Sequence, residues 1–571
     1  MKSRKCEPSN LTDRTDGRLP IYATLRDAHD TEQYSFHMPG HSAGHGFSAE
    51  FQEWLPRLDT TELPTTGDLN EPDGAVADSQ RMAAAYFGAA ETIFLTGGAT
   101  SGIQAMLLGV VGMGGKVLID PMSHRAVLNA AALWQIETVM IAPTLQSDPE
   151  FSPAANHFSS AYPSSGDPSS LIDHFDHSLS TNFSYETDDR SGGAGPACPD
   201  WYDPLPHVTA CDLNDSLNRH QDASAVLITS PDYYGNTADL AALNKVCLDH
   251  NVPLLVDEAH GAHFACDPSI FPRTALAAGC ASCVQSTHKT LAALTPTALL
   301  HVGQKAPFEA RTLMAALRLI RTSSPPLAMA ASIEYAVDDL RSRGATLFQA
   351  IHTELKLLSG RLRHPYRISP VTSASTRARR DPTRLVIDTS EVAPAMAVAE
   401  ELVKRGIVIE FADLMRLILV PGIGLPISSW PALASELNRI GDEWRTKSPD
   451  MGPTRRLDSL LTAAYRRDDR APNPALTAAR FRHAPKGENL EVVEIPLEEA
   501  DGRTLVESIT PYPPGIPLVW PGERLNAGLI SLLRELWSNG IRCQGLESRS
   551  GQLFAHVLRE DHVFYPPLNH V

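Results

Sequence analysis

With 571 residues, the chain is too long for one ordinary hydrophobic core, and its length predicts two to four domains. A hydrophobic fraction of 43% is typical of a globular protein, and a net charge of −18 without a basic stripe argues against a nucleic-acid partner. No run of about 18 apolar residues and no signal-peptide core occur, so we expect no membrane partner and interpret the eight cysteines as reduced thiols of a cytoplasmic protein.

Three histidines near the N-terminus recur at intervals of four residues, at His37, His41 and His45. On a helix this spacing could ligate zinc. The Pro39-Gly40 pair makes a helix across the first interval unfavourable. We therefore expect a loop that borders the functional site, and no metal.

Short apolar runs alternate with helical patterns from about residue 92 to residue 270. Several of the runs are apolar throughout, as in a parallel sheet that is buried on both faces. This alternation predicts an α/β fold with a mostly parallel central sheet. The expected strands are 92–95, 116–120, 225–229 and 253–257, and the expected helices are 104–111 and 240–250.

The stretch 147–206 interrupts this alternation, because it is rich in Ser, Pro, Asp and Gly and has few large apolar residues. Such a composition is typical of a mobile surface insertion. Its histidines, His157, His174 and His177, have no regular spacing, which favours a solvated loop over a metal site.

A glycine-rich segment, Gly97 to Gly102, lies between an expected strand and an expected helix. Backbone N–H groups at a helix N-terminus, together with the hydroxyls of Thr100 and Ser101, could bind a phosphate. A purely structural turn is the alternative, since many strand–helix connections are rich in glycine.

Asp257 ends one apolar strand, and Lys289 follows the run Val284-Gln285-Ser286-Thr287 further along the chain. Lysine can form a Schiff base with an aldehyde cofactor, and a carboxylate can keep a pyridine nitrogen protonated. A pyridoxal 5′-phosphate (PLP) enzyme needs both groups. The alternatives are a helix-capping aspartate and an ordinary surface lysine. His124, which follows another strand, could lie over a cofactor ring or be an ordinary loop histidine.

Residues 257–260 also spell the DEAH box of some helicases. That interpretation requires a Walker A loop. The nearest candidate, Gly114-Gly115-Lys116, is followed by Val117 and has Val110 in place of the first glycine, so we exclude a helicase. The lone pair Cys280 and Cys283 is interpreted as small core residues.

Composition shifts also predict the domain boundaries. A helical pattern ends near residue 326, and the prolines and glycine of 447–453 indicate a linker. A further helix is expected after the linker, and the prolines of 511–517 predict an extended loop. The expected units are an N-terminal segment (1–45), a large domain (46–315, with the insertion 147–206), a small α/β domain (316–446) and a C-terminal α+β domain (454–571).

Several of these segments resemble the Orn/Lys/Arg decarboxylase family of PLP enzymes. They are FHMPGH (36–41), DTTELP (59–64), 97–104, SHRAVLN (123–129), TSPDYYG (229–235), VDEAHGAH (256–263), VQSTHKT (284–290), 512–517 and PGE (521–523). The resemblance extends from about residue 19 to residue 537. It implies the aspartate-aminotransferase fold and decarboxylation of lysine, arginine or ornithine to a di- or polyamine. It also implies a homodimer or a multiple of dimers. Within the family, the chain resembles the shorter members, which lack an N-terminal wing domain.

The resemblance also implies a role for individual residues. Lys289 would hold the cofactor, Asp257 would pair with its ring nitrogen and His124 would stack on its ring. The phosphate would be surrounded by Ala99, Thr100, Ser101, Ser286 and His288, with Ala99 in place of the family's usual hydroxyl residue. His260 would lie near the substrate side, and Thr322 and Ser323 would reach the neighbouring subunit's cofactor. From the mechanism of decarboxylation, we expect Lys289 or His288 to protonate Cα. We also expect an acidic residue to meet the distal cation of the substrate, and Glu523 is our candidate unless it is a surface carboxylate.

Two other functions remain open from the sequence. One is a different PLP reaction on an amino acid, such as that of an aminotransferase or an aldolase. The other is an inactive scaffold or regulatory partner, against which the presence of Lys289, Asp257 and His124 argues. The sequence does not indicate which of the three basic amino acids is the substrate.

Overall fold

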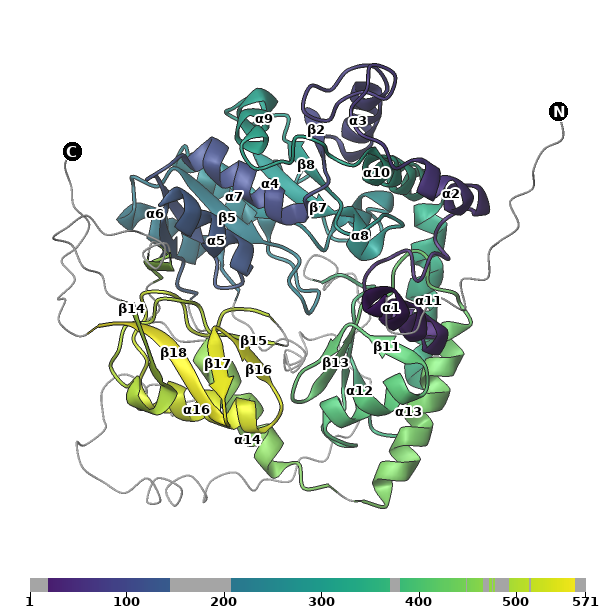
Figure 1. Ribbon diagram of the computed structural model, residues 1–571, viewed down its shortest axis with the longest axis vertical. Helices are drawn as coiled ribbons and strands as arrows, with labels where there is room; N and C mark the ends of the chain where they lie inside the picture. The colour runs from purple at the N-terminus through teal and green to yellow at the C-terminus, as the bar shows by residue number, and fades with distance from the viewer. Residues whose placement is uncertain are drawn as a thin grey trace, which may run out of the picture.

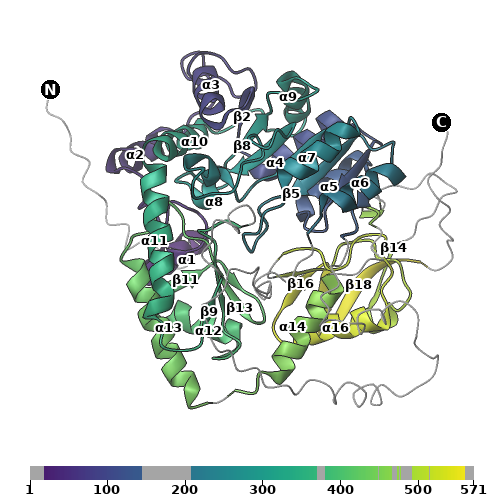
Figure 2. The same cartoon turned by 180° about the vertical axis from the view of Figure 1, so that it is seen from behind.

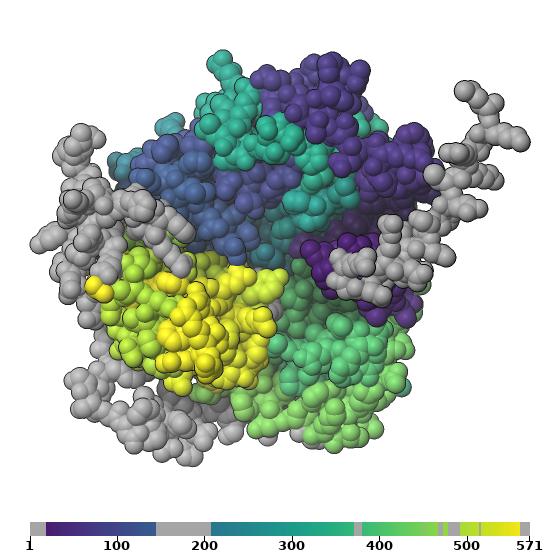
Figure 3. Space-filling view, in the orientation of Figure 1, coloured from purple at the N-terminus to yellow at the C-terminus, as the bar shows by residue number. Residues whose placement is uncertain are grey.

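The structure is a computed structural model of the chain and describes residues 19–143, 207–369, 380–447, 449–465, 472–474, 476–477, 492–512 and 515–559. A large domain, a small domain and a C-terminal domain pack against one another (Figures 1 and 3). The insertion expected at 147–206 lies outside the described residues. The domain boundaries expected from composition stay predictions.

The large domain is built on a seven-stranded sheet in the order β2-β8-β7-β6-β5-β3-β4. All neighbouring pairs among β7, β6, β5, β3 and β4 are parallel, and β8 is antiparallel to both of its neighbours. The expected mostly parallel sheet is therefore confirmed. Its strands are β2 (Glu91–Leu95), β3 (Lys116–Ile119), β4 (Glu137–Met140), β5 (Ala225–Thr229), β6 (Leu254–Asp257), β7 (Ser282–Ser286) and β8 (Ala298–Val302).

Helices cover both faces of this sheet (Figures 1 and 2). Because side chains alternate along a strand, neighbouring residues enter different cores. Val117 and Ile119 of β3 pack with α4, α5 and α9, whereas Leu118 packs with α6 and α7. The buried Cys280 and Cys283 lie in the second of these cores, as expected. The helices are α3 (Gly74–Phe87), α4 (Gly98–Met106, continued by a π-helical turn, Leu107–Val111), α5 (Arg125–Trp134), α6 (Ala210–Arg219), α7 (Leu240–Asp249), α8 (Thr287–Thr290) and α9 (Ala310–Arg318), with a 3-10 turn at Ala262–Cys266.

The small domain contains an antiparallel sheet in the order β12-β13-β10-β9, and its strand β11 pairs in parallel with the N-terminal strand β1. The N-terminal segment is thereby tied to the small domain. Its elements are α1 (Pro20–Thr31), β1 (Tyr34–Phe36), α2 (Ala49–Trp54) and a 3-10 turn (Leu55–Arg57). The small domain comprises α10 (Leu327–Asp339), a π-helical turn (Leu340–Gly344), α11 (Ala345–Arg361), β9 (Arg367–Ile368), β10 (Leu385–Asp388), α12 (Ala395–Lys404), β11 (Ile407–Ile409), β12 (Phe411–Ala412), β13 (Arg416–Leu419) and α13 (Ser429–Arg445).

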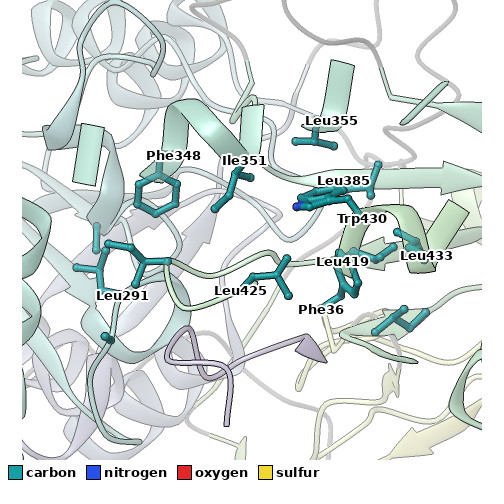
Figure 4. Close-up of a cluster of buried hydrophobic side chains, with 14 of the residues drawn as sticks. Phe36, Leu291, Phe348, Ile351, Leu355, Leu385, Leu419, Leu425, Trp430 and Leu433 are labelled. Carbon is teal, nitrogen blue, oxygen red and sulfur yellow. The ribbon is translucent and has the colours of Figure 1, made fainter. Parts of the chain in front are cut away.

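One hydrophobic cluster joins the small domain to the segment that carries Lys289 (Figure 4). The rings of Phe36 and Trp430 meet edge to face, with their centroids 5.4 Å apart. Leu291, two residues beyond Lys289, is fully buried in the same cluster. Close packing on this side fixes the backbone from which Lys289 projects.

The C-terminal domain combines a three-stranded sheet, β14-β18-β17, with a separate pair, β15-β16. Two expectations need correction. The run 511–517 was expected to be a loop throughout, but its first residues belong to a strand, because Pro511 pairs with Cys543. A proline is tolerated there because the strand lies at the edge of its sheet. The linker at 447–453 is also shorter than expected, because α14 already begins at Gly452 and proline is favourable in the first helical turn. The elements are α14 (Gly452–Tyr465), β14 (Val492–Pro496), a 3-10 turn (Leu497–Glu499), β15 (Thr510–Tyr512), α16 (Ala527–Ser538), β16 (Arg542–Gln544), β17 (Leu546–Arg549) and β18 (Gln552–Leu558).

Among the residues that the structure describes, none of the helices has the length and apolar character that a membrane span requires.

Candidate active site

The carboxyl ends of the parallel strands bring the candidate residues to one edge of the large sheet. Asp120 follows β3, Asp257 ends β6 and Ser286 ends β7. Asp120 joins two of these strands, because its Oδ2 accepts a hydrogen bond of 3.0 Å from the N–H of Thr229 on β5. This edge is where open α/β sheets bind their ligands.

Lys289 lies in the short helix α8, directly after β7. Its Nζ is 2.8 Å from Nε2 of His260 and 5.9 Å from the ring centroid of Tyr233. Burial lowers the pKa of Lys289 to about 8, against the opposing effect of the Asp257 carboxylate. About a tenth of such an amine is unprotonated at pH 7, far more than for an ordinary lysine.

Asp257 is 4% exposed, and its Oδ1 accepts a hydrogen bond of 3.1 Å from the N–H of Ala259. Burial raises its pKa, and the nearby cation of Lys289 lowers it. The two residues on which the sequence interpretation rests are therefore close enough to interact electrostatically.

Three histidines share this environment. His124 caps α5, and its Nδ1 accepts a hydrogen bond of 3.2 Å from the N–H of Ala126. The Nδ1 of His288 is 2.8 Å from the carbonyl oxygen of Thr297. Burial lowers the pKa of His124 and of His288 to about 4, and it lowers that of His260 well below its ordinary value. All three rings are consequently neutral at pH 7.

Helix α4 begins at Gly98, and within the described part of the chain no side chain caps its N-terminus. Ser101 Oγ donates a hydrogen bond of 2.9 Å to the carbonyl of Gly98, Ala99 is half-buried and Thr100 is exposed. Ser286, at the end of β7, is 1% exposed, and its Oγ has no hydrogen-bond partner among the described residues. A buried hydroxyl without a partner is unfavourable, so this atom is suited to a ligand.

The histidine-bearing N-terminal segment is a loop that packs on the Lys289 segment. Gly40 donates a hydrogen bond of 2.7 Å from its N–H to the carbonyl of His288. A Cβ at Gly40 would lie 2.4 Å from the carbonyl carbon of Thr290, so only glycine fits there. His37 and His41 bind different groups: His37 Nε2 is 2.9 Å from Glu32 Oε1, and His41 Nδ1 accepts from the N–H of Gly44.

Three residues of the site were missed in the sequence. The ring of Tyr233 lies edge-on to His260, with centroids 4.9 Å apart, and Nη2 of Arg384 is 3.1 Å from Nδ1 of His260. Glu410 accepts a hydrogen bond of 2.9 Å from the N–H of Met38. Two signals were available in the sequence. Tyr233 lies inside TSPDYYG, and Arg384 and Glu410 each stand directly beside an apolar run.

The remaining candidates lie elsewhere. Glu523 is in the C-terminal domain and is 7% exposed, so the alternative of a surface carboxylate is wrong. Its Oε2 accepts a hydrogen bond of 3.1 Å from the N–H of Trp520, which keeps it in its own loop. Thr322 and Ser323 are exposed between α9 and α10. The roles expected for these three residues stay predictions.

Two family models match the chain. The model described as "Orn/Lys/Arg decarboxylase, major domain" matches residues 19–155 and 207–358, and the model of the C-terminal domain of the same family matches residues 458–549. The chain belongs to the Orn/Lys/Arg decarboxylase family. Members of this family are PLP-dependent carboxy-lyases of basic amino acids, so the expected activity is supported and an aminotransferase or aldolase is not favoured.

Relatives in this family match over most of their length. The chain is 28% identical to the "Uncharacterized protein YaaO" of Bacillus subtilis, over 95% of the chain and 99% of that protein. It is 24% identical to an arginine decarboxylase of Bacillus anthracis, over 96% of this chain and 98% of that protein. This near-equal length agrees with the expected likeness to the shorter members of the family. The fold is similar to that of the constitutive lysine decarboxylase of Escherichia coli, with a TM-score of 0.65 at 20% identity over 95% of this chain and 82% of that one.

The family implies PLP as cofactor, and the residues present fit it. The partly unprotonated amine of Lys289 suits an aldehyde, and the buried Asp257 suits a pyridinium nitrogen. The Ser286 hydroxyl and the N-terminus of α4, neither of which has a side-chain partner among the residues that the structure describes, suit a phosphate.

Proposed function

We propose that the protein decarboxylates lysine, arginine or ornithine, with Lys289 as the lysine that holds PLP and Asp257 as the partner of its ring nitrogen. The observation that carries the proposal is the contact of 2.8 Å between Lys289 Nζ and His260 Nε2, beside the buried carboxylate of Asp257. When bound, PLP supplies a conjugated ring that accepts the electrons of the broken Cα–carboxylate bond.

The residues of the chain prepare this pocket. Asp257 holds a proton on the ring nitrogen, because a buried carboxylate is stabilised by an opposite charge. The neutral ring of His124 is suited to stacking without adding a second positive charge. Ser286, Ser101 and His288, with the backbone at Ala99 and Thr100, are the proposed phosphate contacts.

Lys289 is the better candidate for the proton donor to Cα. Its pKa of about 8 lies near the physiological pH, where proton transfer is efficient in both directions. The pKa of His288 is about 4, and its Nδ1 is engaged with Thr297, so its ring seldom carries the proton that would be needed.

A side-by-side assay tests the reaction and the substrate. Arginine, lysine and ornithine, each labelled in the carboxylate carbon, are supplied at equal concentration, and labelled CO₂ and the amine are quantified together. One substrate should release both products in equal amounts and at least about 10-fold faster than the other two. Formation of a keto acid, or no release from any of the three, would contradict the proposal.

We also propose that the active form is a homodimer or a multiple of dimers, in a cytoplasmic pathway of polyamine synthesis. The exposed hydroxyls of Thr322 and Ser323 are compatible with a contact to a neighbouring subunit. Sedimentation of the purified protein should give at least twice the mass of one chain, and a monomer with full activity would disprove the assembly.

A further inference from the structure

The side chain of His260 lies between Arg384 and Lys289. Its Nδ1 is 3.1 Å from Nη2 of Arg384, and its Nε2 is 2.8 Å from Nζ of Lys289. A guanidinium group is always protonated and can only donate, so Nδ1 must accept. A neutral imidazole that accepts at Nδ1 carries its proton on Nε2. Arg384 therefore determines which nitrogen of His260 is protonated.

The second contact then constrains Lys289. Because Nε2 of His260 is a donor, the Nζ of Lys289 has to accept. An amine can accept only through its lone pair, which a protonated ammonium group lacks. A charged Lys289 would place two donors 2.8 Å apart, an arrangement that cannot be a hydrogen bond. The contact with His260 is thus compatible only with the unprotonated amine.

Arg384 is held firmly enough for this role. It is 2% exposed, and its Nη1 donates a hydrogen bond of 3.2 Å to the carbonyl of Tyr233. The backbone passes close by, because a Cβ at Gly235 would lie 2.5 Å from Cβ of Arg384. Asp381, three residues before Arg384, fixes the backbone here, because its N–H donates a hydrogen bond of 2.7 Å to the carbonyl of Gly235.

Other ionisable groups surround Lys289 and His260, and some favour the charged form of Lys289 whereas others oppose it. Asp257 and Glu410 favour the charged form of Lys289, whereas burial and Arg384 oppose it. His124 and His288 face His260, and Tyr233 lies edge-on to its ring. Among the residues that the structure describes, Arg384 and Lys289 are the two hydrogen-bond partners of the His260 nitrogens.

We propose that Arg384 is a positioning residue that acts through His260 to favour the unprotonated amine of Lys289, which is the form that captures the cofactor. The inference deepens the proposed function, since it rests on Lys289 as the attachment site. An amine joins an aldehyde through its lone pair, and both amine hydrogens leave with the carbonyl oxygen as water. An amine that has to lose a proton first would capture the aldehyde more slowly at neutral pH.

The first test is the tautomer of His260 in the full-length chain freed of cofactor. Histidine is labelled with ¹⁵N, and the His260 signals are assigned by their loss in His260→Gln. At a pH of about 9, above the pKa of Lys289, Nε2 should be protonated and Nδ1 bare. A protonated Nδ1, or a ring charged on both nitrogens, would overturn the inference without any change to Arg384.

The second test measures the reactivity of Lys289 as a function of pH. The cofactor-free chain is trace-labelled with a small amine-reactive anhydride, and the peptide that carries Lys289 is quantified by mass spectrometry. The wild-type reactivity should be half-maximal near pH 8. In Arg384→Met the midpoint should rise by at least about one pH unit, which corresponds to roughly 10-fold lower reactivity at pH 7.

Arg380→Met is the matched control. Arg380 is a buried cation of the same segment. Its Nη1 donates to Asn236 and its Nη2 donates to the backbone carbonyl of Arg384, whereas the contact with His260 comes from the Arg384 side chain. Its removal should leave the midpoint of Lys289 unchanged. An equal rise of the midpoint in both variants would indicate a general charge effect and would overturn the role of His260. An unchanged midpoint in Arg384→Met would overturn it as well. Neither test needs substrate or decarboxylation, so a failed proposed function would be recognised separately.

Discussion

Ser282 and Ser286 lie on the same strand, and both are almost fully buried, but only one hydroxyl is paired. Ser282 Oγ donates a hydrogen bond of 2.6 Å to the carbonyl of His301, whereas Ser286 Oγ has no partner among the described residues. Leaving a buried hydroxyl unpaired costs about 1–3 kcal/mol. Such a cost is typical of functional sites, where a ligand completes the hydrogen bonding.

Ser286→Ala should therefore separate stability from cofactor binding. The cofactor-free variant should be as stable as the wild type or up to about 1 kcal/mol more stable, because the unpaired hydroxyl is removed. Its affinity for PLP should fall by about 10-fold, since one phosphate contact is lost. Urea denaturation and a titration of PLP absorbance measure the two effects.

Ser282→Ala is the control on the same strand. It should destabilise the protein by about 1 kcal/mol, because it removes a satisfied hydrogen bond and leaves the carbonyl of His301 without that donor. Its PLP affinity should not change. If both variants lost PLP equally, Ser286 would have no special role toward the phosphate.

Asp257→Asn should lower kcat by about 10²-fold or more, because the amide carries no charge to hold a proton on the ring nitrogen. The cofactor should still bind through Lys289. The neighbouring Glu258→Gln is the matched control, since the Glu258 carboxylate accepts hydrogen bonds from Gln285 and Ala275 instead. Steady-state assays at saturating substrate make the comparison, and a similar loss in both variants would argue against the role of Asp257.

Lys289 should reduce the stability of the cofactor-free protein in a pH-dependent way. Its pKa is about 8 in the folded chain and near its ordinary value of 10.5 in the unfolded chain. Between these values the unfolded chain binds the extra proton, so stability rises with pH, and below pH 8 the full cost is present. Lys289→Met should therefore be more stable than the wild type at pH 7, by about 1–3 kcal/mol.

This difference should shrink as the pH rises from about 8 toward 10.5. Urea denaturation of both cofactor-free proteins at several pH values provides the measurement. A difference that does not depend on pH would show that Lys289 is not held in a site that disfavours its charge.

Glu523→Gln should raise KM for the basic substrate by at least about 10-fold, with a smaller effect on kcat, because the charge that meets the distal cation is lost. The amide oxygen can still accept the hydrogen bond from Trp520, so the loop should keep its conformation. Equal KM values for variant and wild type would leave Glu523 with a purely structural role.

The sequence was sufficient to predict the parallel sheet and to place the main candidate active-site residues at the ends of its strands. Its central strands are apolar on both faces, so their carboxyl ends, with Asp257 and the segment before Lys289, could be located directly. Arg384 and Glu410 could not be found in this way. They come from the small domain, and only tertiary packing brings them to the large sheet.

The protonation and burial of individual side chains could not be predicted from the sequence either. The tautomer of His260 depends on a contact with a residue 124 positions away. The burial of Glu523 depends on the packing of the C-terminal domain, which a single carboxylate in a proline-rich stretch does not reveal.

The central claim is that Lys289 holds the cofactor, and reductive trapping tests it most directly. The purified protein is incubated with PLP, reduced with borohydride and digested, and the modified peptide is identified by mass spectrometry. The added pyridoxyl mass should be found on Lys289 and be absent in Lys289→Ala. Stoichiometric modification of a different lysine, with Lys289 unmodified, would contradict this account.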